Sequence, residues 1–339
     1  MSWGVDSAIA AYLLQQQWYD VVAWFMKNYV SDSGNCTTYN DAEEAIKVSK
    51  FLWIEILSFD LQKEYNEKII EYIYHGYQQG ITPNPDVLCN SLIKFDVFLE
   101  KALELWFDYI ATGHYARIEK DKKEYTLLRW IDYNKDQSYF LAGLNQYQLS
   151  KSLFPVWWYS KPEIRGLAKK IWLPNAARKD SQWLCFIGNI PIKEFLLKKL
   201  PNKEGNIVNT EGKVVGKHEW AYFFTIGQRQ GLKLPFKAYV IKTDVKENTV
   251  TVGEKEDKAL FGKTITTTGR HWIRKEHKMP TKILAKIRYR QEPQEATLKK
   301  DKNKDIVVTF KEKQRAIAPG QTIVAYKGDE CIGSGVITG

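Results

Sequence analysis

The sequence predicts an α/β fold, in which a doubly wound parallel-sheet domain is followed by a small β-rich domain and a C-terminal antiparallel β-barrel. A chain of 339 residues is longer than one ordinary hydrophobic core supports. Helical and strand-like segments alternate up to about residue 190, and shorter β-like runs broken by Gly, Pro and Asn follow. We therefore expect domains at residues 1–190, 191–262 and 263–339.

Alternating helical and apolar segments predict the fold of the first domain. Asp6 and Ser7 can cap a helix that continues to about Gln17. The apolar runs 21–26, 54–59 and 107–112 are expected to be strands, and the segments 40–52, 61–77 and 91–105 are expected to be helices. Strands that alternate with helices favour a parallel sheet, whose ligands bind at the carboxyl ends of its strands.

The two later domains are predicted from short β-like segments. In the middle domain we expect strands at 207–208, 213–215, 222–226, 238–242 and 249–252. In the last domain, alternating patterns at 283–290, 306–310, 321–326 and 331–337 favour a small barrel. The lysines at 299, 300, 302 and 304 alternate with Asp301 and Asp305, and we expect a solvated hairpin tip there rather than an RNA site.

The chain opens with a near match to a phosphate-binding turn. Residues 2–7 are Ser-Trp-Gly-Val-Asp-Ser, one residue away from the Ser-Gly-Gly-Val-Asp-Ser turn of ATP pyrophosphatases. Such a turn needs positive φ and close backbone approach to phosphate, which Trp3 does not allow easily. Only Met1 precedes the turn, although a strand is expected there. Either the start codon was placed too late or the fold lacks that strand, and the sheet edges that its loss would expose favour the first explanation.

Eleven of the 12 tryptophans stand where glycine fits the local pattern better. Trp18, for example, follows a helical run as a C′ glycine does, and only Trp272 suits its surroundings. One hypothesis is that the gene comes from a lineage that reads UGA as glycine and was translated with UGA as tryptophan. The alternative is a chain rich in tryptophan for stacking. The positions concerned are Trp3, Trp18, Trp24, Trp53, Trp106, Trp130, Trp157, Trp158, Trp172, Trp183 and Trp220.

Charge and cysteine spacing narrow the class of protein. The net charge of +10 fits a polyanionic partner such as RNA, although many basic proteins bind no nucleic acid. Without an apolar run of about 18 residues or a signal-peptide pattern, we expect a cytoplasmic protein with no membrane partner. The four cysteines lie far apart with no C-x-x-C pair, which argues against a zinc site or a disulfide scaffold, and we expect no metal-ligand cluster.

Two cysteine segments suggest sulfur chemistry. Thr82 to Asn90, Thr-Pro-Asn-Pro-Asp-Val-Leu-Cys-Asn, places Asp86 and Cys89 three residues apart before a predicted helix, where the helix dipole favours a thiolate. A rigid turn with a buried cysteine would give the same pattern. In 179–188, polar residues lead into Cys185 in an apolar stretch, where packing is the simpler explanation. Together with a nucleotide turn, however, the two thiols suggest activation of a carbonyl oxygen followed by attack from sulfur.

At this point the chain resembles the bacterial tRNA-specific 2-thiouridylases, a family of PP-loop ATP pyrophosphatases, over nearly its whole length. The resemblance rests on the turn at 2–7, Phe-Met-Lys-Asn at 25–28, the two cysteine segments, Ala-Thr-Gly-His at 111–114, Asn-Lys-Asp-Gln-Ser-Tyr-Phe-Leu at 134–141, Thr-Ile-Gly-Gln-Arg at 225–229, Arg-Tyr-Arg-Gln at 288–291 and Pro-Gly-Gln at 319–321. Trp3 and Trp183 depart from the family pattern.

The resemblance implies an enzyme that adenylates the wobble uridine of tRNA and then transfers persulfide sulfur to C2. It implies that Cys185 carries the persulfide, that Cys89 is the partner nucleophile and forms a disulfide with Cys185 when the sulfur leaves, and that Asp86 is an acid or base. ATP and Mg²⁺ would be held by Ser2, Trp3, Gly4, Val5, Asp6, Ser7, Met26 and Gly113. The flipped base and the tRNA would be contacted by Asn84, Pro85, Asp86, His114, Lys135, Asp136, Gln137, Arg288, Tyr289 and Gln321.

The partners implied are a tRNA of the Lys, Glu or Gln type and a persulfide donor, either a cysteine desulfurase or a sulfur-relay protein. The sequence is also compatible with two other functions. A PP-loop synthetase that adenylates a different substrate would not need two thiols. A catalytically impaired homologue would bind tRNA without thiolating it, as Trp3 and Trp183 would suggest if they are genuine.

Overall fold

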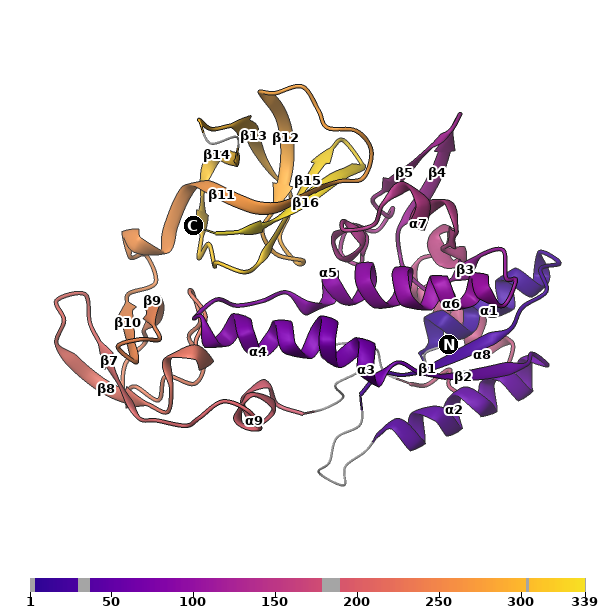
Figure 1. Cartoon of the computed structure of the whole chain (residues 1–339), viewed down its shortest axis with the longest axis horizontal. Coiled ribbons are helices and arrows are strands. Elements are labelled where there is room, and N and C mark those ends of the chain that lie inside the picture. Colours follow the sequence, from indigo (N-terminus) through magenta and orange to yellow (C-terminus); the bar gives the residue numbers. More distant parts are fainter. Residues whose placement is uncertain (1–3, 30–36, 179–189, 303–304, 339) are drawn as a thin grey trace. The chain divides into compact units, whose positions relative to one another are not determined.

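The computed structural model describes residues 4–29, 37–178, 190–302 and 305–338 (Figure 1). The chain forms two compact units. Unit 1 comprises Met1–Ile69, Asp86–Asn189 and Asp329–Ile332, and unit 2 comprises Ile70–Pro85, Ile190–Gly328 and Gly333–Gly339. The predicted fold class is confirmed, because parallel strands with helices occupy the first part of the chain and a β-rich part and a closed barrel follow.

Unit 1 contains two parallel strand pairs. β1 (Ala23–Lys27) pairs with β2 (Ile56–Asp60), and β3 (Ile110–Ala111) pairs with β6 (Ser152–Leu153), so the described residues of unit 1 form two separate parallel pairs rather than the expected continuous sheet. The helices here include α1 (Val5–Gln16), α2 (Thr37–Leu52), α7 (Gln146–Ser150) and α8 (Lys161–Lys170).

One apolar core supports the start of the chain. Buried side chains of α1 pack with residues of α2 and α8 and with Tyr115 and Trp130. The helix α1 is anchored there by fully buried Ala8 and Ile9. Burial of this kind fixes the N-terminal end of α1 in place, and that end is the expected nucleotide site.

Two long helices depart from regular α geometry. The first consists of α3 (Gln62–Tyr65), a π-helical segment Asn66–Ile70 and α4 (Glu71–Gln78). The second consists of α5 (Pro85–Cys89), a π-helical segment Asn90–Val97 and α6 (Phe98–Glu104). The predicted start of this second helix at Ser91 is wrong, because Pro85 already takes the N1 position that suits its fixed φ.

Unit 1 also contains an antiparallel hairpin that the sequence did not predict. β4 (Arg117–Asp121) pairs with β5 (Glu124–Leu128), and Glu330 and Cys331 at the start of β16 (Glu330–Ile337) pair with β5. The hairpin was missed because charged residues dominate β4, so its alternation of apolar and polar residues is weak.

The middle part of unit 2 is a four-stranded sheet. The strands β7 (Gly205–Val208), β8 (Val214–His218), β9 (Tyr239–Asp244) and β10 (Thr249–Gly253) lie in the order β8-β7-β10-β9 around a small apolar core. The predicted strand at 222–226 is wrong. Ala221–Phe223 form a 3-10 turn, which tertiary packing of the aromatic side chains favours over their β propensity.

Six antiparallel strands form the closed barrel, and β11 pairs with β16 to close it. They are β11 (Phe261–Trp272), β12 (Thr281–Lys286), β13 (Gln294–Lys300), β14 (Ile306–Arg315), β15 (Thr322–Lys327) and β16. The sequence missed β11 and β13. The expected hairpin tip is confirmed between Lys300 and Ile306, although Lys304 lies outside the described residues.

Within the described ranges, no helix combines the length and the apolarity that a membrane crossing requires.

Candidate functional site

The expected nucleotide site begins at the N-terminus of α1. Gly4 is the N-cap residue, with φ −74° and ψ 146°, and its carbonyl accepts from the amide of Ala8. The amides of Val5, Asp6 and Ser7 follow in the first turn. Such amides and the helix dipole favour a phosphate group. Ser2 and Trp3, predicted for the same site, lie outside the described residues.

Asp6 is held by two side chains that the sequence did not indicate. The Tyr115 hydroxyl donates to Asp6 Oδ1 at 2.6 Å, and Lys161 Nζ lies 2.6 and 2.7 Å from the two carboxylate oxygens. The Lys161 side chain is 12% exposed, so water screens this ion pair only weakly. Lys161 is the first residue of α8, which begins with a capping box between Ser160 and Glu163. The capping pattern was a readable signal for a helix start, but the contact with Asp6 was not.

Gly113 lies directly against Asp6. A Cβ at Gly113 would be 2.6 Å from the Asp6 carbonyl carbon and 2.8 Å from its oxygen, so only glycine fits. Two of the predicted nucleotide residues are thus brought together from segments more than 100 positions apart. Met26 is partly buried in β1, near the carboxyl end of that strand.

Asp86 and Cys89 lie on one helix. Because α5 begins at Pro85, Asp86 is in the first turn and Cys89 is one turn further on. The spacing of three places both side chains on the same helix face. Cys89 is 1% exposed and lies past the residues on which the helix dipole acts most strongly, so the dipole favours a thiolate less than the predicted boundary implied.

Asn90 ties this helix to the following loop. Its Nδ2 donates to the carbonyl of Asp86 at 3.1 Å and to that of Phe140 at 3.2 Å. Phe140 belongs to the 3-10 segment Ser138–Leu141, which follows the predicted tRNA-contact residues. The cysteine helix is therefore fixed relative to that loop.

The residues before Asp86 are bound within unit 2. The amide of Thr82 donates to the carbonyl of Pro319 at 2.9 Å, and Gln321 Nε2 donates to the carbonyl of Thr82 at 2.9 Å. The hydroxyls of Thr82 and Thr225 are 2.9 Å apart. Gly320, with φ +88°, approaches so closely that a Cβ would be 2.8 Å from the Thr82 carbonyl oxygen. The barrel and the middle sheet thus hold the turn in which Asn84 and the following residues were predicted to bind the base.

The helix α4 packs against the same turn. A Cβ at Gly76 would be 3.1 Å from the ring of Pro83. Burial raises the pKa of the Tyr72 hydroxyl, and a hydrogen bond from the backbone of Asn84 partly opposes this effect. Tyr72 therefore stays protonated near neutral pH and marks a solvent-shielded contact beside Asn84.

The loop with Lys135, Asp136 and Gln137 is only partly exposed. Asp136 was predicted to contact tRNA, but it is 1% exposed and its carboxylate accepts from the amides of Trp130 and Ser138 and from the Ser138 hydroxyl. These hydrogen bonds stabilise the conformation of the loop. Lys135 is exposed, and its contact with tRNA stays a prediction.

His114 and Gln137 connect this loop to the segment after β3. The side-chain oxygen of Gln137 accepts from the amide of Tyr115 at 2.9 Å, and the Gln137 amide donates to the Tyr115 carbonyl at 2.8 Å. His114 Nδ1 lies 2.7 Å from the Thr112 hydroxyl. Burial, reinforced by the charge of Lys94, holds the pKa of His114 well below 6.5, so the ring is neutral at pH 7.

The other predicted tRNA residues belong to unit 2. A guanidinium nitrogen of Arg288 donates to the carbonyl of Ala316, and the Tyr289 ring lies 6.0 Å from Lys286 Nζ. Arg288 and Gln321 therefore serve the internal structure of unit 2 as well as any role at its surface. Cys185 lies outside the described residues.

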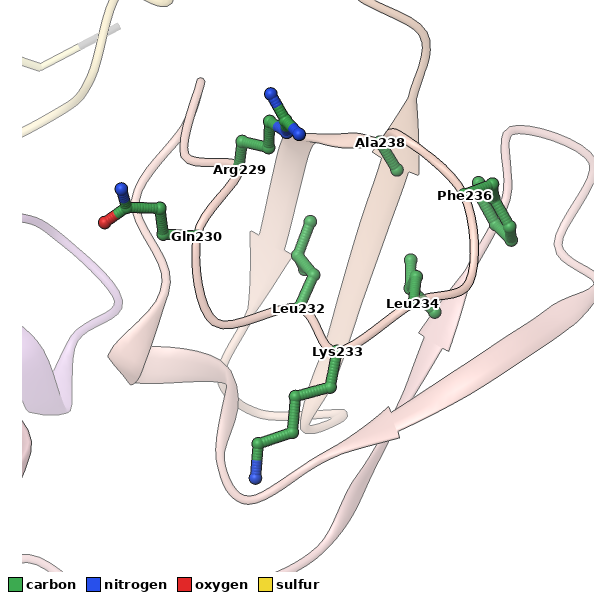
Figure 2. Close-up of a pocket in the computed structure, with 7 residues that line it drawn as sticks. All are labelled: Arg229, Gln230, Leu232, Lys233, Leu234, Phe236 and Ala238. Carbon is green, nitrogen blue, oxygen red and sulfur yellow. The ribbon is translucent and has the colours of Figure 1, made fainter.

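A pocket of about 540 Å³ opens in the middle domain. Figure 2 shows the loop curving around Leu232 and Leu234, with Gln230 and Lys233 directed away from its centre. The lining contains no thiol and no carboxylate, so this pocket is distinct from the site expected around Cys89 and Asp86. Its lining residues are Arg229, Gln230, Leu232, Lys233, Leu234, Phe236 and Ala238.

Among the residues that the structure describes, no group of three or more His, Cys, Asp or Glu side chains is placed to hold a metal ion. Asp6 lies in the first turn of α1, at the expected phosphate site. A cation there would therefore have to share its coordination with the phosphates of the nucleotide.

Comparison with known proteins covers almost the whole chain. Residues 1–189 match the model described as tRNA methyl transferase HUP domain, residues 193–254 the tRNA methyl transferase PRC-barrel domain, and residues 262–337 the aminomethyltransferase beta-barrel domain. These three matches follow the same order as the parallel-strand part, the four-stranded sheet and the barrel.

Similar full-length proteins are named tRNA-specific 2-thiouridylase MnmA. The protein from Flavobacterium johnsoniae is 43% identical, with 100% of this chain and 98% of the relative covered. Those from Bacillus licheniformis and Bacillus subtilis are 42% and 41% identical, with 99% of this chain and 93% of each relative covered. Identity of this extent over both chains establishes common descent, and the chain belongs to the tRNA-specific 2-thiouridylase family.

Proposed function

We propose that this protein is a tRNA-uridine 2-sulfurtransferase that converts the wobble uridine of tRNA to 2-thiouridine with the use of ATP. The observation that carries the proposal is the similarity to 2-thiouridylases over 99% or more of the chain. The geometry supports it, because Gly113 lies directly against Asp6 at the N-terminus of a helix and Asp86 and Cys89 share one helix face.

In the first step, the O2 atom of uridine attacks the α-phosphorus of ATP and pyrophosphate leaves. The amides of Gly4 to Ser7 would bind the phosphates, and Mg²⁺, held by Asp6 together with the phosphates, would neutralise the charge that develops on them. Lys161 and Tyr115 hold the Asp6 carboxylate in one orientation in the nucleotide-free chain, and Mg²⁺ would share its oxygens with the Lys161 ammonium.

In the second step, sulfur attacks C2 and AMP leaves with the former carbonyl oxygen. Cys185 would carry the persulfide from a cysteine desulfurase or a sulfur-relay protein. The Cys89 thiolate would attack the inner sulfur of Cys185, which forms a Cys89–Cys185 disulfide and releases the outer sulfur as hydrosulfide. Asp86, one turn before Cys89, would accept or return the proton. A reductant must then reopen the disulfide.

The wobble base must leave its stack to bring O2 and C2 into a pocket. Asn84, Pro85 and Asp86 would hold the flipped base, and the exposed Lys135 would meet the tRNA backbone, in keeping with the net charge of +10. His114 in unit 1 and Arg288, Tyr289 and Gln321 in unit 2 would make further contacts with the tRNA. The substrates would be tRNAs of the Lys, Glu or Gln type, and the setting would be the cytoplasm.

The test is ATP- and sulfide-dependent formation of 2-thiouridine on unmodified tRNA, measured by mass spectrometry of nucleosides. The expected nucleoside has the mass of uridine with one oxygen replaced by sulfur. A methylated nucleoside would instead support a tRNA methyltransferase activity, which the descriptions of the matched domains mention. With a persulfide donor as sulfur source, Cys89→Ser and Cys185→Ser should each abolish the product, while Cys331→Ala, at a buried cysteine in the barrel, should retain it. Wild-type protein that binds tRNA but yields no modified nucleoside would refute the proposal.

A further inference from the structure

Asn28 is a buried polar side chain whose hydrogen-bonding atoms are unused. It is 3% exposed, and within the described part of the chain neither its Nδ2 nor its Oδ1 has a hydrogen-bond partner. Leaving a buried amide unpaired destabilises a folded protein, so such groups usually meet a ligand, an ion or water. The feature therefore points to a ligand as the partner of this amide.

The position of Asn28 is that of a ligand-binding residue. It directly follows β1, and ligands of parallel sheets bind at the carboxyl ends of strands. The neighbouring groups are already engaged, since the Lys27 carbonyl accepts from the amide of Leu61 and Lys27 Nζ lies 3.6 Å from the Asp60 carboxylate. These contacts fix the end of β1. The side-chain amide of Asn28 is left there without a hydrogen-bond partner among the described residues.

We propose that Asn28 recognises the adenine ring of ATP. A carboxamide presents one donor and one acceptor side by side, and the N6 amino group and N7 of adenine match them in a bidentate pair. The inference rests on the proposed use of ATP and adds a residue that selects the base of the nucleotide. The free enzyme then carries an unpaired amide that ATP satisfies.

The test uses Asn28→Leu, a near-isosteric apolar replacement, in the full chain. The melting temperature of the nucleotide-free variant should equal or exceed that of the wild type, because an unpaired buried amide is removed. The rise in melting temperature that ATP causes in the wild type should be lost, and the Kd for ATP should increase about tenfold or more. Asn90→Leu is the matched control, since it removes two internal hydrogen bonds and should lower the melting temperature without ligand.

A purely structural Asn28 would give the opposite pattern, in which Asn28→Leu lowers the melting temperature as Asn90→Leu does and retains ATP affinity. That result would overturn the inference while leaving the proposed function intact. If ATP fails to stabilise even the wild-type protein, the proposed use of ATP fails first. Asn28→Asp, which keeps the acceptor and loses the donor, should also weaken ATP binding.

An independent observation concerns four helix ends. Trp18, Trp53, Trp106 and Trp172 follow α1, α2, α6 and α8 and have φ of 65°, 57°, 66° and 59°. Their side chains are 86% to 94% exposed, so no packing compensates for the left-handed backbone.

All four ends have the hydrogen bonds of a Schellman motif. The Trp18 amide donates to the Gln15 carbonyl and the next amide to that of Leu14, and the other three tryptophans repeat this pattern. The helix α4 ends in the same way with Gly80, at φ 73°, whose amide donates to the carbonyl of Tyr77. The chain thus uses glycine for this position in α4 and tryptophan in the other four helices.

The geometry points to glycine at these four positions in the protein that the native cell makes, with UGA codons read as glycine. Trp24 and Trp130 are outside this inference, because both are buried, Trp24 stacks on Phe59 at 4.0 Å, and the Trp130 indole donates to the carbonyl of Trp157. Their packing gives no indication of glycine. The structure therefore supports glycine at four of the eleven positions of the original hypothesis and gives no support at Trp24 and Trp130.

Sequencing the gene and the native peptides tests the inference. UGA codons and glycine-containing peptides are expected at the four positions, and UGG codons would overturn it. In the tryptophan-containing chain, Trp18→Gly or Trp106→Gly should raise the melting temperature by a few degrees, because a left-handed tryptophan is replaced by a residue that adopts φ > 0 readily. Trp130→Gly is the control and should lower it, since a fully buried side chain is lost.

Discussion

Lys161 holds the carboxylate of the nucleotide turn, and a double-mutant cycle with Asp6 measures how strongly. Lys161→Met removes the ammonium and keeps most of the apolar stem, and Asp6→Asn removes the negative charge. The pair has contacts of 2.6 and 2.7 Å, with side chains 12% and 28% exposed. A charge-assisted hydrogen bond that is mostly shielded from water contributes about 1.5–3 kcal/mol, so we expect a coupling energy of about 2 kcal/mol.

The assay is urea denaturation of the wild type, the two single variants and the double variant, with the coupling taken from the four free energies of unfolding. Lys101→Met with Glu64→Gln forms the control cycle, because that pair is 3.8 Å apart with both side chains about one-third exposed. Its coupling should stay below about 0.5 kcal/mol. If the Lys161–Asp6 coupling is no larger than that of the control, the claim that Lys161 orients Asp6 is refuted.

The remaining predictions concern the base-binding turn, the histidine after β3 and the buried aspartate. Thr225→Val should lower kcat for thiolation severalfold with tRNA affinity unchanged, because it removes the hydroxyl that contacts the Thr82 hydroxyl. Thr225→Ser keeps a hydroxyl and should restore the rate. An unchanged kcat in Thr225→Val would contradict this role. Because the pKa of His114 is depressed, the unfolded chain takes up a proton that the folded chain excludes, so stability should fall as pH drops below about 6.5, by up to about 1.4 kcal/mol per pH unit. His114→Gln should flatten that slope in pH-dependent denaturation, and a variant that keeps the wild-type slope would contradict this explanation. Asp136→Ala should destabilise the protein by about 3 kcal/mol or more, since two buried amides lose their acceptor and Arg129 loses an ion-pair partner. A loss below about 1 kcal/mol would contradict its structural role.

The sequence was a good guide wherever a local pattern determines structure. Apolar runs predicted β1 and β2 to within two residues, and three residues of β1 are buried as a continuous hydrophobic strand requires, although β2 is only partly buried. Charged β4 and the long β11 gave no comparable pattern. The predicted strand at 222–226 failed because aromatic residues favour strands in isolation, but these residues pack in a compact turn.

The candidate site was predictable in its parts and not in its assembly. The turn at Asp6 and the segment with Gly113 were each visible, yet their contact depends on the path of the chain between them. The sequence analysis did not identify Lys161, because no local sequence pattern indicates its contact with Asp6. A side chain that acts through one long-range ion pair leaves no periodic signal.

The central claim is that ATP activates the C2 carbonyl oxygen of the wobble uridine, and an isotope experiment tests it directly. A tRNA with heavy oxygen at O2 of that uridine is incubated with the enzyme, ATP and sulfide, and the AMP released is analysed by mass spectrometry. The account predicts that the label appears in AMP in the same amount as the 2-thiouridine formed. Thiolation with unlabelled AMP would show that the oxygen leaves by another route and would contradict the account.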